Sequence, residues 1–287
     1  FSYCNSLTKI EIPSSIVEIG QKAFKSCSSL KEVILPTSIR TIPSGLFCYC
    51  KSLNKIDIPS SVTEIESYVF DGCSSINSIN IPETVTKIGP YAFRNSSINN
   101  VNIPAKLKTI EKGLFSKLYQ LIKLIIPPTV TFIDSFAFHE SSITEITIPP
   151  SVTELGSFAF AECSNLIKVE ILAPLKVISR YTFSDCIHLR EIILPSTVEC
   201  IEQYAFYNCC DLGSISLPES VKYIGQSAFQ SCISLHDIII PPLVTEINPF
   251  TFSQCCNLYK VQLPSSITII DHHAFYKDIF NKVHNIM

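Results

Sequence analysis

Residues Phe1 to Ala23 read F-S-Y-C-N-S-L-T-K-I-E-I-P-S-S-I-V-E-I-G-Q-K-A, and Phe24 begins the same pattern again. Successive copies begin 23 residues apart, except that the copies starting at Phe93 and Phe138 are 22 residues long. The remaining copies begin at Phe47, Phe70, Phe115, Phe160, Phe183, Phe206, Phe229, Phe252 and Phe275. Self-similarity at a fixed short period predicts a solenoid of stacked units instead of one globular core.

Within each copy, counted from its phenylalanine as position 0, apolar residues at positions 9 and 11 flank a residue that is usually polar. Ile10, Glu11 and Ile12 are the first example. This period of two predicts a short strand with one buried face. Proline follows in nearly every copy, as at Pro13, and it ends the strand because it has no N–H to donate.

A second apolar pair lies at positions 15 and 18, for example Val221 and Ile224. Gly20, Gly89 and Gly225 follow this pair in their copies, where we expect a positive φ to turn the chain. The segment between this position and the next phenylalanine is too short for more than one helical turn. The expected fold is therefore of the α/β class, with short parallel strands, turns and single-turn helices.

The unit F-x-x-C-x-S-L-x-x-I-x-I-P-x-S-V-x-x-I-G-x-x-A resembles the BspA-like leucine-rich repeats. The resemblance implies a right-handed curved solenoid of about twelve repeats, with a parallel sheet on its concave side. It also implies a surface or secreted adhesion protein, and it brings no catalytic residues with it. We expect one continuous array over residues 1–275, with the 22-residue repeats at 93–114 and 138–159. Residues 276–287 are expected to form a C-terminal cap, and an N-terminal cap is expected to be missing.

The composition gives no indication of a nucleic-acid partner, because the net charge is −3 and only 16% of residues are charged. No apolar run reaches the ~20 residues of a membrane-spanning helix. We expect Leu121–Ile126 to be a core strand, which Pro127 and Pro128 end.

Nine of the 13 cysteines recur at position 3 of their repeats, which predicts one internal column. The favoured interpretation is that these thiols pack as small buried hydrophobes with a weak S–H donor. Disulfides between repeats and redox chemistry at the pairs Cys209-Cys210 and Cys255-Cys256 remain the alternatives. A linear column holds its thiols too far apart for a tetrahedral metal site, so we expect neither a metal nor a cofactor.

The outward residues of the predicted strands are the candidates for binding. The charge at position 8 alternates along Lys9, Glu32 and Lys55, which indicates that these residues fix the register of neighbouring strands and keep the surface soluble. Isoleucines at position 10, with two more at position 7, replace the polar residues expected there and are candidate protein contacts on the concave face. They are Ile34, Ile122, Ile125, Ile167, Ile193 and Ile239. Scattered exposed isoleucines in strands are the alternative explanation.

Asn95-Ser96-Ser97 is a glycosylation sequon, so Asn95 is a candidate modified residue; neutral drift within this repeat pair is the alternative. The six histidines follow no metal-protease spacing, and there is no phosphate loop or G-x-S-x-G motif. We therefore predict a non-enzymatic module that binds protein or host-surface ligands from a surface or secreted protein. The alternative is an intracellular interaction scaffold or regulatory array in the cytoplasm.

Overall fold

The structure is a computed structural model that describes residues 1–275. Contacts between residues divide the chain into two compact units, Phe1–Ile143 and Thr144–Met287, and each is described by itself. Both units are parallel-strand solenoids in which most repeats contribute two short strands. The cap predicted for residues 276–287 lies outside the described residues.

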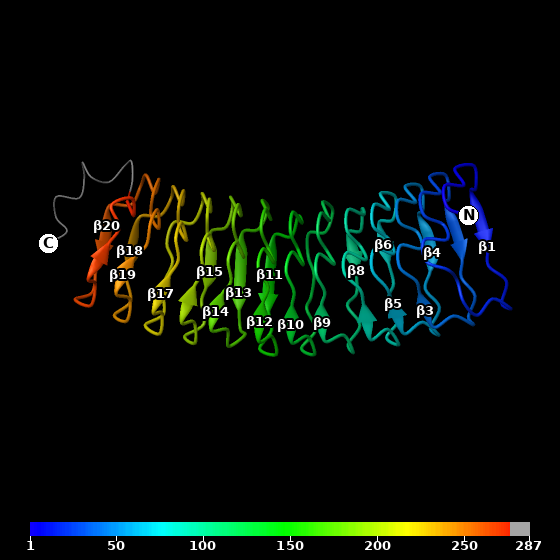
Figure 1. The fold of residues 1–287 in the computed structure, drawn as a ribbon, viewed down its shortest axis with the longest axis horizontal. Helices are drawn as coiled ribbons and strands as arrows, with labels where there is room; N and C mark the ends of the chain where they lie inside the picture. Colours follow the sequence, from blue (N-terminus) through cyan, green and yellow to red (C-terminus); the bar gives the residue numbers. More distant parts are fainter. Residues whose placement is uncertain (276–287) are drawn as a thin grey trace. The chain divides into compact units, whose positions relative to one another are not determined.

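In the first unit, the strands at positions 8–10 form the ladders β1-β2-β4 and β6-β8 (Figure 1). A second row, at positions 17–18, forms the ladders β3-β5-β7 and β9-β10. The first-row strands are β1 (Lys9–Glu11), β2 (Glu32–Ile34), β4 (Lys55–Asp57), β6 (Ser78–Ile79) and β8 (Asn100–Val101). The second-row strands are β3 (Thr41–Ile42), β5 (Glu64–Ile65), β7 (Lys87–Ile88), β9 (Thr109–Ile110) and β10 (Phe132–Ile133).

The second unit repeats this plan, with first-row ladders β11-β13-β15 and β18-β20 and second-row ladders β14-β16-β17 and β19-β21. Its first-row strands are β11 (Glu145–Ile148), β13 (Lys168–Ile171), β15 (Glu191–Ile193), β18 (Asp237–Ile239) and β20 (Lys260–Gln262). Its second-row strands are β12 (Glu154–Leu155), β14 (Val177–Ile178), β16 (Cys200–Ile201), β17 (Tyr223–Ile224), β19 (Glu246–Ile247) and β21 (Ile269–Ile270).

The repeat phenylalanines form the centre of each core. In the first unit their rings stack from Phe1 to Phe138 with centroids 5.5 to 6.0 Å apart. In the second unit the stack from Phe160 to Phe275 has spacings of 5.3 to 5.6 Å. Phe47 to Phe252 are fully buried at each repeat. Every repeat thus covers the core of its neighbour, as the sequence period requires.

The segment around each phenylalanine is a turn, and within residues 1–275 no residue is helical. The expected single helical turns are therefore wrong. Residues two before and two after the phenylalanine have left-handed backbone angles, such as Lys22 (φ 58°) and Ser26 (φ 57°). The N–H groups of Lys22, Phe24 and Ser26 donate to carbonyls 22 residues further along the chain, on the next turn of the solenoid, at 2.9, 3.1 and 2.8 Å. The backbone therefore satisfies its donors between repeats, where a helix would satisfy them internally.

Two further expectations need correction. Gly20, Gly89 and Gly225 do not have a positive φ, which occurs instead at Gly45, Gly72 and Gly113. Leu121–Ile126 is not a strand, although Leu121, Leu124 and Ile126 are buried as predicted. In the preceding 22-residue repeat the ladder stops after Val101, and the Asn102 side chain exchanges hydrogen bonds of 2.9 and 2.8 Å with the backbone of Ile81. The repeat that precedes residues 121–126 therefore offers them only the short strand β8 as a pairing partner.

Candidate functional site

The outward side chains at positions 8 and 10 form what we call the first-strand face, and the position-7 isoleucines Ile122 and Ile167 come directly before it in their repeats. In β11 and β13 exposed and buried residues alternate strictly along four residues. Because side chains of a strand point to opposite faces in turn, the buried positions 9 and 11 fix the direction of positions 8 and 10. The face is thus dictated by the same apolar pattern that forms the core.

All six candidate isoleucines are exposed to solvent, and Ile34, Ile193 and Ile239 lie in first-row strands. Their exposed fractions are 40% for Ile34, 54% for Ile122, 87% for Ile125, 41% for Ile167, 68% for Ile193 and 59% for Ile239. The structure does not gather them into one patch: Ile122 and Ile125 share a repeat in the first unit, whereas Ile34 lies on β2. Exposed apolar residues on a regular sheet are suited to contacts with another protein. Their role in binding stays a prediction.

The charges at position 8 pair across the ladder. Glu32 accepts from Lys55 at 2.7 Å and from Lys9 at 3.1 Å, and Lys168 pairs with Glu191 at 3.2 Å. Hydrogen bonds from Lys55 and Lys9 lower the pKa of the Glu32 carboxyl, and the Glu32 hydrogen bond raises the pKa of Lys55. Exposed pairs of this kind contribute little to stability because water screens them, so they mainly fix the register of neighbouring strands.

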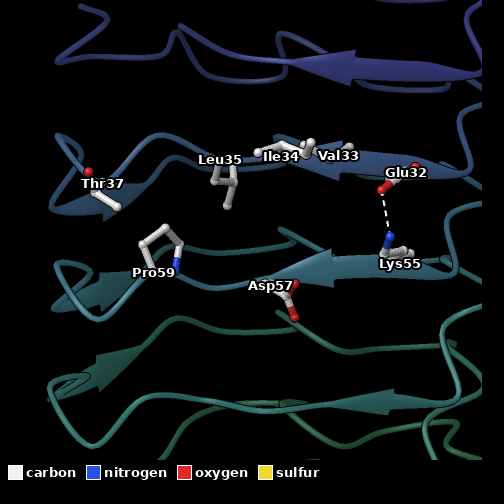
Figure 2. A pocket seen from close by; sticks show the side chains of 8 residues that line it. All are labelled: Glu32, Val33, Ile34, Leu35, Thr37, Lys55, Asp57 and Pro59. Atoms are coloured by element: carbon white, nitrogen blue, oxygen red, sulfur yellow. Dashed lines mark hydrogen bonds and ion pairs between the residues drawn. The ribbon is translucent and has the colours of Figure 1, made fainter. Parts of the chain in front are cut away.

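A depression of about 400 Å³ opens on the first-strand face between β2 and β4 (Figure 2). Ile34 and Leu35 supply apolar lining, and the Glu32–Lys55 pair and Asp57 supply charge. Thr37 and Pro59 line its far end. The depression therefore combines an exposed isoleucine with charged groups of both signs.

A second depression, of about 240 Å³, lies beside the second-row strands β16 and β17. It is lined by Arg180, Cys200, Glu202, Gln203 and Tyr223, and the Glu202 carboxylate accepts the backbone N–H of Arg180 at 2.8 Å. This depression was not predicted from the sequence because the second row was not predicted to form strands. Position 17, where Val177, Cys200 and Tyr223 follow one another at 23-residue spacing, is the signal that could have found it.

The position-3 thiols are packing groups, which confirms the favoured interpretation of the cysteine column. All 13 cysteines are thiols without a disulfide, and the position-3 cysteines from Cys27 onward are buried. Their sulfurs donate to the carbonyl of the preceding repeat's phenylalanine, as from Cys50 Sγ to Phe24 O at 3.0 Å and from Cys186 Sγ to Phe160 O at 3.2 Å. Burial raises the pKa of Cys50 to about 12, which keeps the thiol protonated and unreactive at neutral pH.

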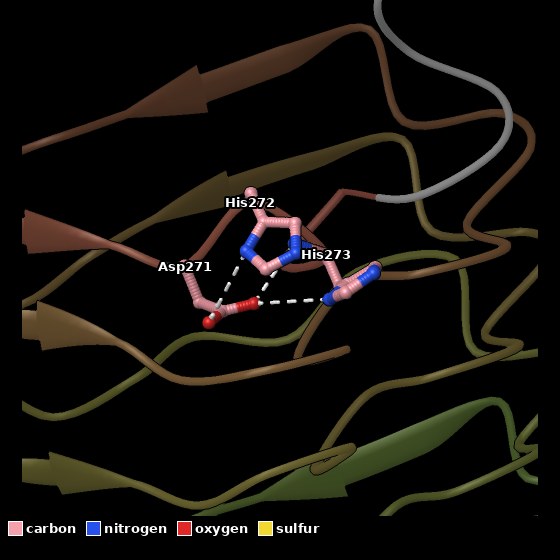
Figure 3. Close-up of side chains that lie close together, drawn as sticks. All are labelled: Asp271, His272 and His273. Carbon is pink, nitrogen blue, oxygen red and sulfur yellow. Dashed lines mark hydrogen bonds and ion pairs between the residues drawn. The ribbon is translucent and has the colours of Figure 1, made fainter.

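Asp271, His272 and His273 bring three potential metal ligands together in an exposed turn (Figure 3). The Nδ1 atoms of His272 and His273 lie 3.8 and 3.7 Å from the Asp271 carboxylate oxygens. Two imidazoles and a carboxylate are a donor set that Zn²⁺ accepts. The three ligands are consecutive residues, so the turn can hold this arrangement without any other repeat. The expectation of no metal site stays a prediction.

Asn95 is exposed and has a left-handed backbone conformation (φ 53°) two residues after Phe93. The hydroxyl of Ser97, the third residue of the sequon, donates to Ser74 O at 2.7 Å. The asparagine side chain is therefore open to solvent, which a glycan needs. Its modification stays a prediction.

A family model described as the BspA type leucine-rich repeat region matches the chain in six copies, over residues 1–122, 40–167 and 153–281. No sequence among the curated proteins matches the chain. Among the described residues, no helix has the length and apolar character needed to cross a membrane.

Three crystal structures illustrate the likeness of fold. A leucine-rich repeat protein from Bacteroides ovatus is 26% identical, with a TM-score of 0.60 over 94% of this chain and 84% of that one. A leucine-rich cell surface protein from Faecalibacterium prausnitzii is 26% identical, with a TM-score of 0.57 over 98% of this chain and 83% of that one. The pneumococcal vaccine antigen PcpA is 23% identical, with a TM-score of 0.53 over 92% of this chain and 67% of that one, and shows the fold alone.

Proposed function

Because the chain belongs to the BspA type leucine-rich repeat family, we propose that it is a non-enzymatic adhesion module that binds proteins through its first-strand face. The observation that carries this proposal is the exposure of the isoleucines at position 10, with Ile125 and Ile193 the most exposed at 87% and 68%. Strand hydrogen bonding fixes the backbone of Ile34, Ile193 and Ile239, so little conformational entropy is lost when a partner covers these three side chains. The likeness to a cell surface protein from Faecalibacterium prausnitzii supports a place at the cell surface or outside the cell.

The proposal is tested by adhesion of beads coated with the purified chain to monolayers of mucosal epithelial cells. The double variant Ile125→Asp/Ile193→Asp places charges where the partner would have to desolvate them, so we expect adhesion to fall by about tenfold or more. Melting temperature should change little, because both side chains already face water.

The matched control is Val177→Asp/Ile269→Asp, which changes two apolar residues of the second-row strands that are 37% and 59% exposed. Adhesion of the control should equal that of the unaltered chain. Full adhesion by the Ile125→Asp/Ile193→Asp variant would remove the isoleucines of the first-strand face from consideration.

The second candidate function is an intracellular interaction scaffold, and the thirteen thiols without a disulfide favour it. Secreted proteins commonly carry disulfides, whereas the cytosol keeps thiols reduced. In this array, however, burial of the position-3 thiols against phenylalanine carbonyls supplies a packing reason for them in either compartment. The free thiols are therefore weaker support for an intracellular scaffold than the likeness to a cell surface protein is for a surface location.

A glycan on Asn95 would distinguish the two candidates, since N-glycosylation requires passage through a secretory pathway. For the surface protein, we expect mass spectrometry of the chain purified from its native cells to find a glycan on the peptide that contains Asn95. An unmodified Asn95 in protein taken from the cytosol would instead favour the scaffold.

A further inference from the structure

The outward residues next to Ile34 differ from those next to the other isoleucines. Ile34 on β2 pairs in register with Glu11 on β1 and with Asp57 on β4. Neighbouring strands lie about 4.8 Å apart, so the two carboxylates bracket the isoleucine within about 10 Å. Ile239 pairs with Gln262, and Ile193 pairs with Glu170 on one side, with Ser216 at the same position of the next repeat. Among the isoleucines at position 10, Ile34 is thus the one between two acids.

The two acids are available to a partner. Within residues 1–275, neither the Glu11 nor the Asp57 side chain makes a hydrogen bond or an ion pair, and both residues are exposed. The lysines nearby are already engaged: Lys9 and Lys55 both bind Glu32 at position 8, two residues along the strand. The charges at position 8 therefore partly neutralise one another, whereas both charges at position 10, on Glu11 and Asp57, are negative.

We propose that this place on the first-strand face, made by Glu11, Ile34 and Asp57, binds an arginine side chain of the partner protein. An arginine carries an aliphatic stem that packs on apolar surface and a planar guanidinium with five N–H donors that suits carboxylates. The depression of about 400 Å³ beside Ile34 and Asp57 provides room for the stem along Leu35 and Pro59 (Figure 2). Apolar contact and charge complementarity then act on the same side chain, which gives specificity as well as affinity.

The test uses the full chain with isotope-labelled isoleucine methyl groups and a short blocked peptide, acetyl-Gly-Ser-Arg-Ser-Gly-amide. At low-millimolar concentration the peptide should shift the Ile34 methyl resonance and leave the Ile239 methyl resonance in place. The same peptide with citrulline, which is nearly isosteric with arginine but uncharged, should produce no shift at Ile34. Equal shifts with both peptides, or none with either, would overturn the proposal.

Glu11→Gln/Asp57→Asn keeps the shape of the site and removes its charge, so we expect the peptide to bind at least about tenfold more weakly. Unchanged methyl resonances of Ile42 and Ile65, which are buried in the same unit, report that the fold is intact. Gln262→Asn is a matched control beside Ile239 and should leave binding at Ile34 unaffected. Full peptide binding by the doubly neutralised variant would contradict the assignment of the two carboxylates.

The inference rests on the proposed function, but the two can fail separately. Loss of adhesion in Ile125→Asp/Ile193→Asp without any peptide shift at Ile34 would reject the arginine site alone. If the peptide shifts the Ile34 methyl resonance but no first-strand variant changes adhesion, the proposed adhesion function is rejected and the arginine site is kept.

Discussion

Arg94 and Asp71 form an ion pair whose carboxylate is buried. The Asp71 side chain is only 2% exposed, and Arg94 reaches it with Nε and Nη2 at 2.9 and 2.8 Å. The guanidinium also lies over the stacked rings of Tyr68 and Tyr91, 5.5 and 5.1 Å from their centroids. One arginine therefore ties three neighbouring repeats together at the turns.

At this scale we predict that Arg94→Ala lowers the free energy of unfolding by about 3 kcal/mol, because it leaves a buried carboxylate without its partner. The matched control is Arg190→Ala. Arg190 is 64% exposed, and its partner Asp211 keeps a contact with His188 at 3.2 Å, so the expected cost is about 1 kcal/mol or less. Urea denaturation followed by circular dichroism measures both. Equal costs for the two variants would contradict the importance of burial here.

The cysteines illustrate what a sequence can and cannot specify about single residues. Their 23-residue spacing was enough to predict a buried column, because a fixed period puts equivalent residues above one another. The acceptor of each S–H was not predictable, since it is the phenylalanine carbonyl of another repeat, 26 residues earlier in the case of Cys209. The left-handed turns on either side of each phenylalanine, which decide where that carbonyl points, are equally invisible in the sequence: Tyr181, Phe158 and Lys117 all adopt them.

Among the elements, the first row of strands was predictable and the second was not. At positions 9 and 11 buried residues alternate clearly with exposed ones. The second-row strands are two residues long and, apart from β21, offer a single buried isoleucine or leucine, as at Ile224 in β17. The glycines at position 19 were predicted to have a positive φ, which is wrong. A Cβ on Gly225 would lie 2.5 Å from the backbone nitrogen of Gln203, so the glycine permits close approach of the preceding repeat.

We predict from this approach that Gly225→Ala destabilises the second unit by about 1–3 kcal/mol, because backbone atoms have to move apart. Gly213→Ala in the same unit is the control, since its nearest neighbour atom would be 3.6 Å from the new Cβ, an ordinary contact distance. Thermal unfolding of both variants measures the difference. A Gly225→Ala variant as stable as Gly213→Ala would show that close packing against Gln203 does not select this glycine.

At the scale of the whole molecule, the repeat leaves few positions open to function. The phenylalanine stack, the thiol column and the apolar strand positions are buried in both units, and they maintain the fold. The outward positions of the strands vary from repeat to repeat, as the change from Glu11 to Ile34 to Asp57 shows. The sequence could therefore predict which positions are free, but a regular array does not reveal which of its free surfaces meets a partner.

Photo-crosslinking distinguishes these surfaces most directly. The photoreactive residue p-benzoylphenylalanine would replace Ile125 or Ile193 on the first-strand face, or Val177 or Ile269 on the second-row strands, and each chain would be irradiated on epithelial cells. We expect crosslinked cell-surface proteins from the Ile125 and Ile193 positions and none from the Val177 and Ile269 positions. Crosslinks from the second-row positions alone would contradict the claim that the first-strand face binds the partner.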